Sequence, residues 1–419
     1  MAARSALSSG AAHGYQSAMT IALRVFLPFA LTYMLVYSAR VVNGVAGEDI
    51  MADLGLTPAD LGFLTSVYLA GFALFQIPFG VVMDRFGPRK VESATLLLAV
   101  AGCALFAVAQ SFGELVVGRF MMGVGASMCL MAPFTAYRKW FSPERLPVVT
   151  GILMVFGAAG SALAGRPAEA IIAAMGWHAV FAVLGFLTLL GAAAILFVVP
   201  ARHDPPKGPS FAVLFTELAQ LLANRDLWRL APISATSQAG YIAVLGLWTG
   251  PWLRDVAGLS SAAAAWWLSA TAVGMMGGFL GYGTLAGRMT GSRQVFRLFM
   301  AGSILFALTV VGIIVLPPSW GPPLWILSAA LGSGGILTYQ LLTRAFDETL
   351  AGRVNTTLNF MVFFFAFLVQ WLFGVVLGFF PGTEGAASPL GYQVGLAILL
   401  ALQAAAYLPL LITPRVPLD

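Results

Sequence analysis

Charged residues are scarce in this sequence. Lysine, arginine, aspartate and glutamate make up 9% of its 419 residues, whereas hydrophobic residues make up 59%. A soluble domain usually carries about 25% charged residues. At a mean hydropathy of +0.89, a soluble fold would have too few polar side chains to cover its surface. The scarcity of charge excludes an ordinary soluble protein and predicts that lipid surrounds most of the chain.

The sequence also lacks the motifs of several function classes. Its two cysteines, Cys103 and Cys129, lie inside apolar runs, which excludes a disulfide framework and predicts small buried side chains. No nucleophile, base and orienting acid form a catalytic pattern, so we expect no enzyme. The glycine-rich run 332–335 lacks the lysine of a nucleotide-binding loop, and we expect neither ATP nor a cofactor. Anionic lipid explains the net charge of +5, so no nucleic-acid partner is expected.

Long apolar runs occupy most of the chain. A bilayer-spanning helix needs about 20 mostly apolar residues. About twelve such runs occur, at 20–44, 60–83, 91–110, 113–136, 146–168, 177–199, 228–250, 262–283, 295–316, 322–343, 354–380 and 390–412. We predict an all-α membrane protein with a six-helix bundle at 20–199, a central loop at 200–227 and a second six-helix bundle at 228–413. Short tails at 1–19 and 414–419 complete the predicted organisation.

Positive charge falls mostly on one side of these runs. If the N-terminus is cytoplasmic, 18 of the 22 lysines and arginines lie on the cytoplasmic side. Only Arg40, Arg119, Arg166 and Arg254 fall elsewhere. Because cytoplasmic loops are enriched in lysine and arginine, this asymmetry predicts that both termini are cytoplasmic. We take the membrane to be a bacterial cytoplasmic membrane.

The two halves share a motif. Residues 80–90 read GVVMDRFGPRK, and residues 283–293, 203 positions later, read GTLAGRMTGSR. Each copy has a glycine, an arginine five positions on, and then a further glycine and a basic residue. Asp84 of the first copy is replaced by Gly287 in the second. The repeat predicts two related halves with a substrate site between them at mid-depth.

The first copy resembles the signature loop of the major facilitator superfamily, and Arg119 with Gly123 and Gly125 resembles that family's fourth helix. The resemblance covers about residues 20–413 and implies a secondary active transporter whose two halves rock around one central site. The loop would form a latch that is made in one conformation and broken in another. Its residues are Gly80, Asp84, Arg85, Gly87, Arg89 and Arg288. Gly80 and Gly87 would let two helices and a short turn pack closely.

Arg40 and Arg119 fall inside apolar runs, where inserting a charge costs about 2.5–3.5 kcal/mol or more. Arg40 either lines a central cavity and binds an anion, or extends to the outer headgroups. An arginine on the first helix resembles the organophosphate and other anion carriers of the superfamily. Arg119 either ties the helices of the first half together or takes part in proton coupling. No acid is expected near the middle of a span, and Glu92 is placed at a helix end.

Several polar or aromatic residues lie away from the ends of the runs and are candidates for lining the substrate site. They are Tyr37, Arg40, Asn43, Tyr68, Gln76, Gln238, Tyr241, Trp248, Tyr339, Asn359 and Gln370. For each residue, the alternative is a hydrogen bond between helices. Tyr37, Arg40 and Asn43 are spaced three apart and would share a helix face, as would Gln238 and Tyr241. We expect these two clusters to meet between the halves.

The favoured function is secondary active transport of a small organic anion, by proton symport or by exchange, in a protein that is monomeric. The absence of a buried acid argues against the first alternative, an exporter of hydrophobic or cationic compounds. A transition-metal importer ranks third, because Met121, Met122, Met128, Cys129 and Met131 are more simply explained as flexible packing. No metal site is therefore expected. A membrane-embedded sensor is a fourth possibility.

Overall fold

A computed structural model gives the fold. It describes residues 20, 22–142, 145–201, 216, 220–289, 291–344, 346, 351–382 and 387–412. The predicted tails and most of the predicted central loop lie outside these residues. The described chain is helical apart from its connections and one isolated β-bridge between Pro381 and Ala387.

Helices cover every predicted apolar run. The first half contains η1 (Ala22–Phe26), α2 (Leu27–Val41), α3 (Asn43–Leu54), α4 (Pro58–Phe86), α5 (Pro88–Ala107), α6 (Phe112–Ala126), α7 (Met131–Trp140), α8 (Leu146–Leu163), α9 (Arg166–Met175) and α10 (Trp177–Val198). The second half contains α12 (Arg225–Ala243), η2 (Val244–Trp248), α13 (Thr249–Asp255), α14 (Ser261–Gly287), α15 (Ser292–Val315), η3 (Pro318–Trp320), α16 (Gly321–Gly332), η4 (Ser333–Ile336), α17 (Leu337–Arg344), α18 (Ala351–Gly378) and α19 (Pro389–Ile412).

Ten helical segments of the described chain are long and apolar enough to cross a membrane. An eleventh is obtained if Leu23–Val41 and Asn43–Leu54, which are bent by 43° at their junction, count as one span. The remaining predicted run, α12 to α13, is not among them, and α12 carries the polar sequence Ser-Ala-Thr-Ser-Gln at 234–238. A twelve-span topology and the orientation of its ends stay predictions.

Local sequence fixes where α4 begins and ends. Thr57 and Asp60 form a capping box, in which the Thr57 backbone nitrogen donates to the Asp60 carboxylate at 2.9 Å, and Pro58 occupies the first turn. At the other end Gly87 has φ = 80°, a conformation that glycine adopts without the strain of a side chain. Pro88 then starts α5. The signature loop is therefore a tight reversal between two long helices.

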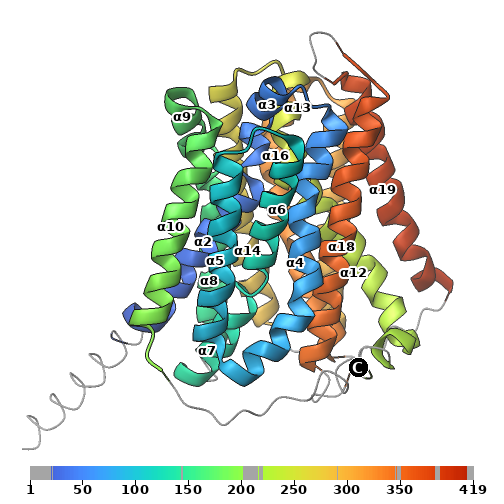
Figure 1. The fold of residues 1–419 in the computed structure, drawn as a ribbon. Coiled ribbons are helices and arrows are strands. Elements are labelled where there is room, and N and C mark those ends of the chain that lie inside the picture. Colours follow the sequence, from blue (N-terminus) through green and yellow to red (C-terminus); the bar gives the residue numbers. More distant parts are fainter. Residues whose placement is uncertain are drawn as a thin grey trace, which may run out of the picture.

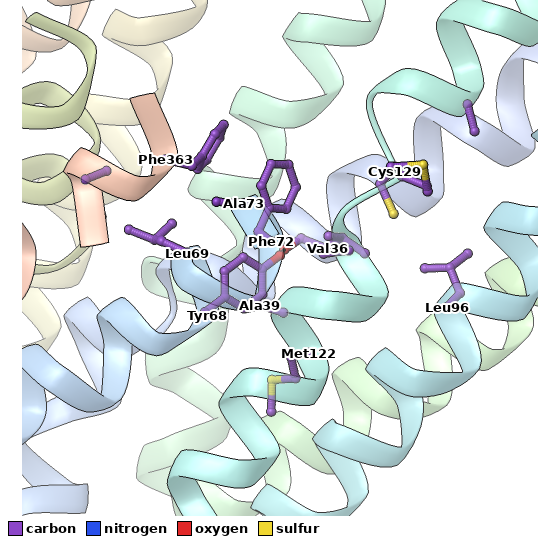
Figure 2. Close-up of a cluster of buried hydrophobic side chains, with 14 of the residues drawn as sticks. Val36, Ala39, Tyr68, Leu69, Phe72, Ala73, Leu96, Met122, Cys129 and Phe363 are labelled. Carbon is purple, nitrogen blue, oxygen red and sulfur yellow. Dashed lines mark hydrogen bonds between the residues drawn. The ribbon is translucent and has the colours of Figure 1, made fainter. Parts of the chain in front are cut away.

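Glycines let the helices of the first half approach closely. A Cβ atom at Gly123 would overlap the carbonyl group of Tyr68 on α4, and one at Gly125 would overlap the backbone of Ala99 on α5. The α6 backbone therefore packs directly on α4 and α5. Figure 2 shows part of the buried hydrophobic cluster around this contact, with Tyr68 among its labelled side chains. Gly80 was predicted to permit close packing, but a Cβ there would have nothing within 4 Å. That prediction is wrong for this conformation.

The two halves meet along α4 with α18 and along α8 with α14. In Figure 1, α3, α9 and α13 lie at the top of the bundle and α7 lies at the bottom. We call the end at α3 and α13 the closed end, because the halves bond to each other there. Arg254 pairs with Glu48 at 2.8 Å and donates to the Gly44 carbonyl oxygen at 3.4 Å. We call the end at α7 the open end.

Candidate functional site

A cavity of about 670 Å³ lies between the two halves. Its wall includes Tyr37 and Arg40 of α2, and it extends to Asp84 and Arg138 near the open end. Helices α4, α7 and α8 of the first half and α12, α17 and α18 of the second all contribute. The volume is within the usual range for small-molecule sites, which is about 300–1,000 Å³.

Arg40 is the cation deepest in this wall. Its guanidinium carbon lies 3.7 Å from the centre of the Tyr37 ring and 5.8 Å from the centre of the Phe363 ring. The Arg40 Nε is buried and has no hydrogen-bond partner. Tyr37 donates a weak bond to the sulfur of Met275 at 3.7 Å. The aromatic rings thus hold the guanidinium in place without using its Nε–H as a hydrogen-bond donor.

A chain of hydrogen bonds crosses between the halves in the cavity wall. Tyr339 donates to the Asn359 side-chain oxygen at 2.6 Å, and the Asn359 nitrogen donates to the Gln76 side-chain oxygen at 2.7 Å. Gln76 belongs to α4, whereas Asn359 belongs to α18 and Tyr339 to α17. The Gln76 Nε2 is buried and has no partner. A second side-chain nitrogen, on α4, is therefore without a hydrogen-bond partner.

Gln238 and Tyr241 of α12 also line the cavity, as predicted from their shared face. The Gln238 nitrogen donates to Ser234 at 3.2 Å and to Thr338 at 3.3 Å. The Tyr241 hydroxyl donates to the Ala329 carbonyl oxygen at 3.3 Å. Of the eleven candidates, the structure brings seven together here, namely Tyr37, Arg40, Gln76, Gln238, Tyr241, Tyr339 and Asn359.

The other four candidates are buried outside the lining, and their placement corrects the prediction. Asn43 donates to Thr65 at 2.9 Å, and the Tyr68 hydroxyl donates to the Val36 carbonyl oxygen at 3.3 Å. The Trp248 indole donates to the backbone oxygen of Gln370 at 3.0 Å. Each of these contacts joins helices to one another. The alternative, an interhelical hydrogen bond, describes the side chains of Asn43, Tyr68 and Trp248, whereas Gln370 takes part through its backbone oxygen.

Arg119 lies inside the first half, away from the cavity. It is fully buried, and one guanidinium nitrogen donates to the Ala39 carbonyl oxygen at 2.6 Å. Its guanidinium carbon lies 5.3 Å from the Phe106 ring centre and 5.4 Å from the Phe181 ring centre. Arg119 therefore ties α6 to α2.

The predicted latch residues lie at the open end. Asp84 is exposed at the cavity mouth, and Arg85 beside it is also exposed. Arg89 was expected to belong to the latch, and in this conformation its Nε donates to the Leu196 carbonyl oxygen of α10 at 2.8 Å. This bond lies within the first half. In the second copy of the motif, Arg288 is exposed at the end of α14.

Sequence reasoning missed a lining face on α7. Met131, Phe134, Thr135 and Arg138 all line the cavity. Their spacing of three, one and three residues follows one helix face, and that spacing was the available signal. Arg138 was counted only as a loop charge. Glu92 was placed at a helix end, yet it is fully buried and both of its carboxylate oxygens lack hydrogen-bond partners. The expectation that the chain has no buried acid is wrong.

Comparison with known proteins agrees with this architecture. The family model of the Major Facilitator Superfamily matches residues 29–370. A probable sulfoacetate transporter of Cupriavidus necator is 33% identical over 159 residues, which are 38% of this chain and 37% of that protein. The multidrug resistance protein MdtL of Shigella dysenteriae is 28% identical over 208 residues, 48% of this chain and 51% of that protein. The matched parts thus span 37% and 51% of the lengths of these two relatives.

Solved structures show the same fold. A bacterial homologue of the human lysosomal transporter Spinster, in an inward-facing and occupied conformation, superposes with a TM-score of 0.69. The match covers 94% of this chain and 96% of that chain at 18% sequence identity. At 18% identity the likeness establishes the arrangement of the helices only.

Proposed function

Because this chain belongs to the Major Facilitator Superfamily, we propose that it is a secondary active transporter of a small organic anion. The observation that carries the proposal is Arg40, a deep cavity cation whose Nε–H has no partner. A guanidinium offers a planar, bidentate site to a carboxylate, sulfonate or phosphate group. The probable sulfoacetate transporter supports the same substrate class, since sulfoacetate is an organic anion.

The charge in the cavity wall favours an anion over a cation. Its described charged residues are Arg40, Arg138 and Asp84, and the acid lies at the mouth with Arg138. An anion beside Arg40 would meet its guanidinium in the cavity wall. A cation at the same depth would meet Arg40, at a cost that grows as water is excluded. Tyr37, Tyr241 and Phe363 would contact an apolar part of the substrate.

We propose that the structure represents the inward-facing state. Most lysines and arginines fall at the end of the bundle where the cavity reaches Asp84 and Arg138, and cytoplasmic loops are enriched in such residues. At the closed end, Arg254 and Glu48 join the halves. In alternating access the halves would separate at the closed end and join at the open end. A monomer in a bacterial cytoplasmic membrane suffices for this cycle.

The signature loop would act when the two halves join at the open end. We expect Asp84→Asn to lower uptake about tenfold, because a neutral side chain would weaken a charge-assisted contact made when the open end closes, at a cost of about 1.5 kcal/mol. Uptake into proteoliposomes measures the effect, with protein abundance in the membrane as the control. Unaltered uptake by Asp84→Asn would remove the latch.

Export of hydrophobic or cationic compounds is the second candidate, and the likeness to MdtL favours it. The buried Glu92 also removes the argument that this chain has no embedded acid. Glu92 does not line the cavity, however, whereas Arg40 does. Metal import ranks below both, because Met122, Met128 and Cys129 are packed into the hydrophobic cluster of the first half.

Thermal stability of the purified protein tests the substrate class. A compound that binds only the folded state raises the free energy of unfolding, by about 2.7 kcal/mol at 100 times its Kd. The melting temperature rises as a result. We expect shifts from small carboxylates, sulfonates or phosphates. Shifts from cations or apolar drugs alone would overturn the anion proposal and favour the exporter.

A further inference from the structure

Glu92 is a buried acid that the transport cavity does not use. It lies in the second turn of α5, its side chain is fully buried, and neither carboxylate oxygen has a hydrogen-bond partner. It is absent from the cavity lining. An ionised carboxylate in such surroundings, with no compensating contact, is very costly, and a buried acid without a partner normally becomes neutral instead.

The groups around Glu92 offer it no compensating charge. The titratable groups that face it are the Cys129 thiol, a weak donor, and the Tyr137 phenol of α7. The Tyr137 hydroxyl donates to the Phe26 carbonyl oxygen at 3.1 Å, so its proton is used elsewhere. On α5 and α6, Lys90 is exposed, whereas Arg89 bonds to Leu196 and Arg119 bonds to Ala39.

Cys129 lies at a break in the fourth predicted span. Helix α6 ends at Ala126 and α7 begins at Met131, and Figure 2 shows Cys129 on the connection between them. The face of α7 beyond the break lines the cavity through Met131, Phe134 and Arg138. Glu92 therefore lies against the joint that positions one wall of the substrate cavity, while remaining outside that wall.

We propose that Glu92 is a proton-binding site, and that its protonation stabilises the conformation in which the cavity reaches the open end. The step is a proton transfer between water and one carboxylate oxygen, with no other bond changed. Loss of the proton would leave an unpaired charge beside the α6–α7 joint and favour the alternative conformation, in which the joint moves and water reaches the acid. The inference deepens the proposed transport cycle by assigning its proton to a site separate from the substrate.

Infrared spectroscopy of the purified protein tests the first half of this proposal without a substrate. At neutral pH the wild type should show the C=O band of a protonated carboxylic acid, and Glu92→Gln should lose that band. Glu114→Gln is the matched control, because Glu114 is an exposed acid that binds backbone nitrogens as a carboxylate. A wild-type spectrum without a band that Glu92→Gln removes would overturn the proposal.

The link to conformation is tested by labelling a cysteine in the cavity wall, at Thr150→Cys, since both native cysteines are buried. Glutamine mimics the protonated acid. Labelling is compared between Thr150→Cys alone and Thr150→Cys combined with Glu92→Gln. At low pH, where Glu92 is protonated, the two proteins should label equally. As the pH rises and Glu92 loses its proton, the ratio of labelling in the double variant to labelling in the single variant should rise by up to about tenfold per pH unit. A ratio that does not change with pH would overturn the link. Neither experiment needs an anion, so failure of the anion proposal in the stability screen would be seen separately.

Discussion

Replacing Arg40 with alanine is expected to weaken binding of a small organic anion by about 30- to 1,000-fold. Removing one partner of a desolvated charge pair costs about 2–4 kcal/mol, and each 1.4 kcal/mol is tenfold in affinity. The loss should be large because the wild-type Nε–H has no competing partner and the Tyr37 ring already holds the guanidinium. The Kd of a carboxylate, sulfonate or phosphate that stabilises the wild type provides the measurement.

Two further variants separate charge from geometry. Arg40→Lys keeps the charge but loses the planar, bidentate group that stacks on Tyr37, so its affinity should lie between wild type and Arg40→Ala. Arg138→Ala removes the same charge from an exposed position at the cavity mouth, where solvent screening should limit the loss to about fivefold. Equal affinity of Arg40→Ala and wild type, with a large loss in Arg138→Ala, would move the anion site to the mouth.

The positions of the helices could be predicted from sequence, because hydropathy and length are properties of each segment alone. Several helix ends were also encoded locally. The start of α4 at Thr57 depends on a capping box, and its end at Gly87 depends on a glycine with positive φ. The depth of Arg40 could not be settled in this way, since a position late in a span is compatible with both a cavity and the headgroups. In the structure Arg40 lies in the cavity wall, one residue before the bend that follows Val41.

The failed site predictions have specific physical causes. Tyr37, Arg40 and Asn43 share a face only on a continuous helix, but α2 ends at Val41 and the chain bends by 43° before Asn43. Asn43 is thereby turned to Thr65. Trp248 is the last residue of a π-helical stretch, whose wider turn changes the side-chain direction relative to Tyr241. Glu92 is near a helix start in sequence, yet the α6–α7 connection covers it, and a break in another helix cannot be inferred from α5.

Closure at the end formed by α3 and α13 depends on Gly250, and Gly250→Ala is expected to disfavour it. A Cβ atom at Gly250 would overlap the carbonyl oxygen of Gly44, so the two backbones can meet as they do only if position 250 has no side chain. Overpacking of this kind costs about 1–3 kcal/mol, which lowers the equilibrium constant for this conformation about 5- to 150-fold. The population of this conformation falls accordingly, so labelling of the cavity-wall cysteine at Thr150→Cys should fall, and uptake should fall with it.

Gly246→Ala is the matched control for this experiment. Gly246 lies one turn earlier in the same helical run, and the nearest atom to a Cβ there would be the Gln370 side-chain nitrogen at 3.8 Å, an ordinary contact. Both substitutions change the helix propensity of the same segment by the same amount, so a difference between them isolates the contact with Gly44. Gly246→Ala should label and transport like the wild type. If Gly250→Ala does so too, the halves need not close where α3 meets α13, and the conformational cycle proposed for this protein would have to use another contact.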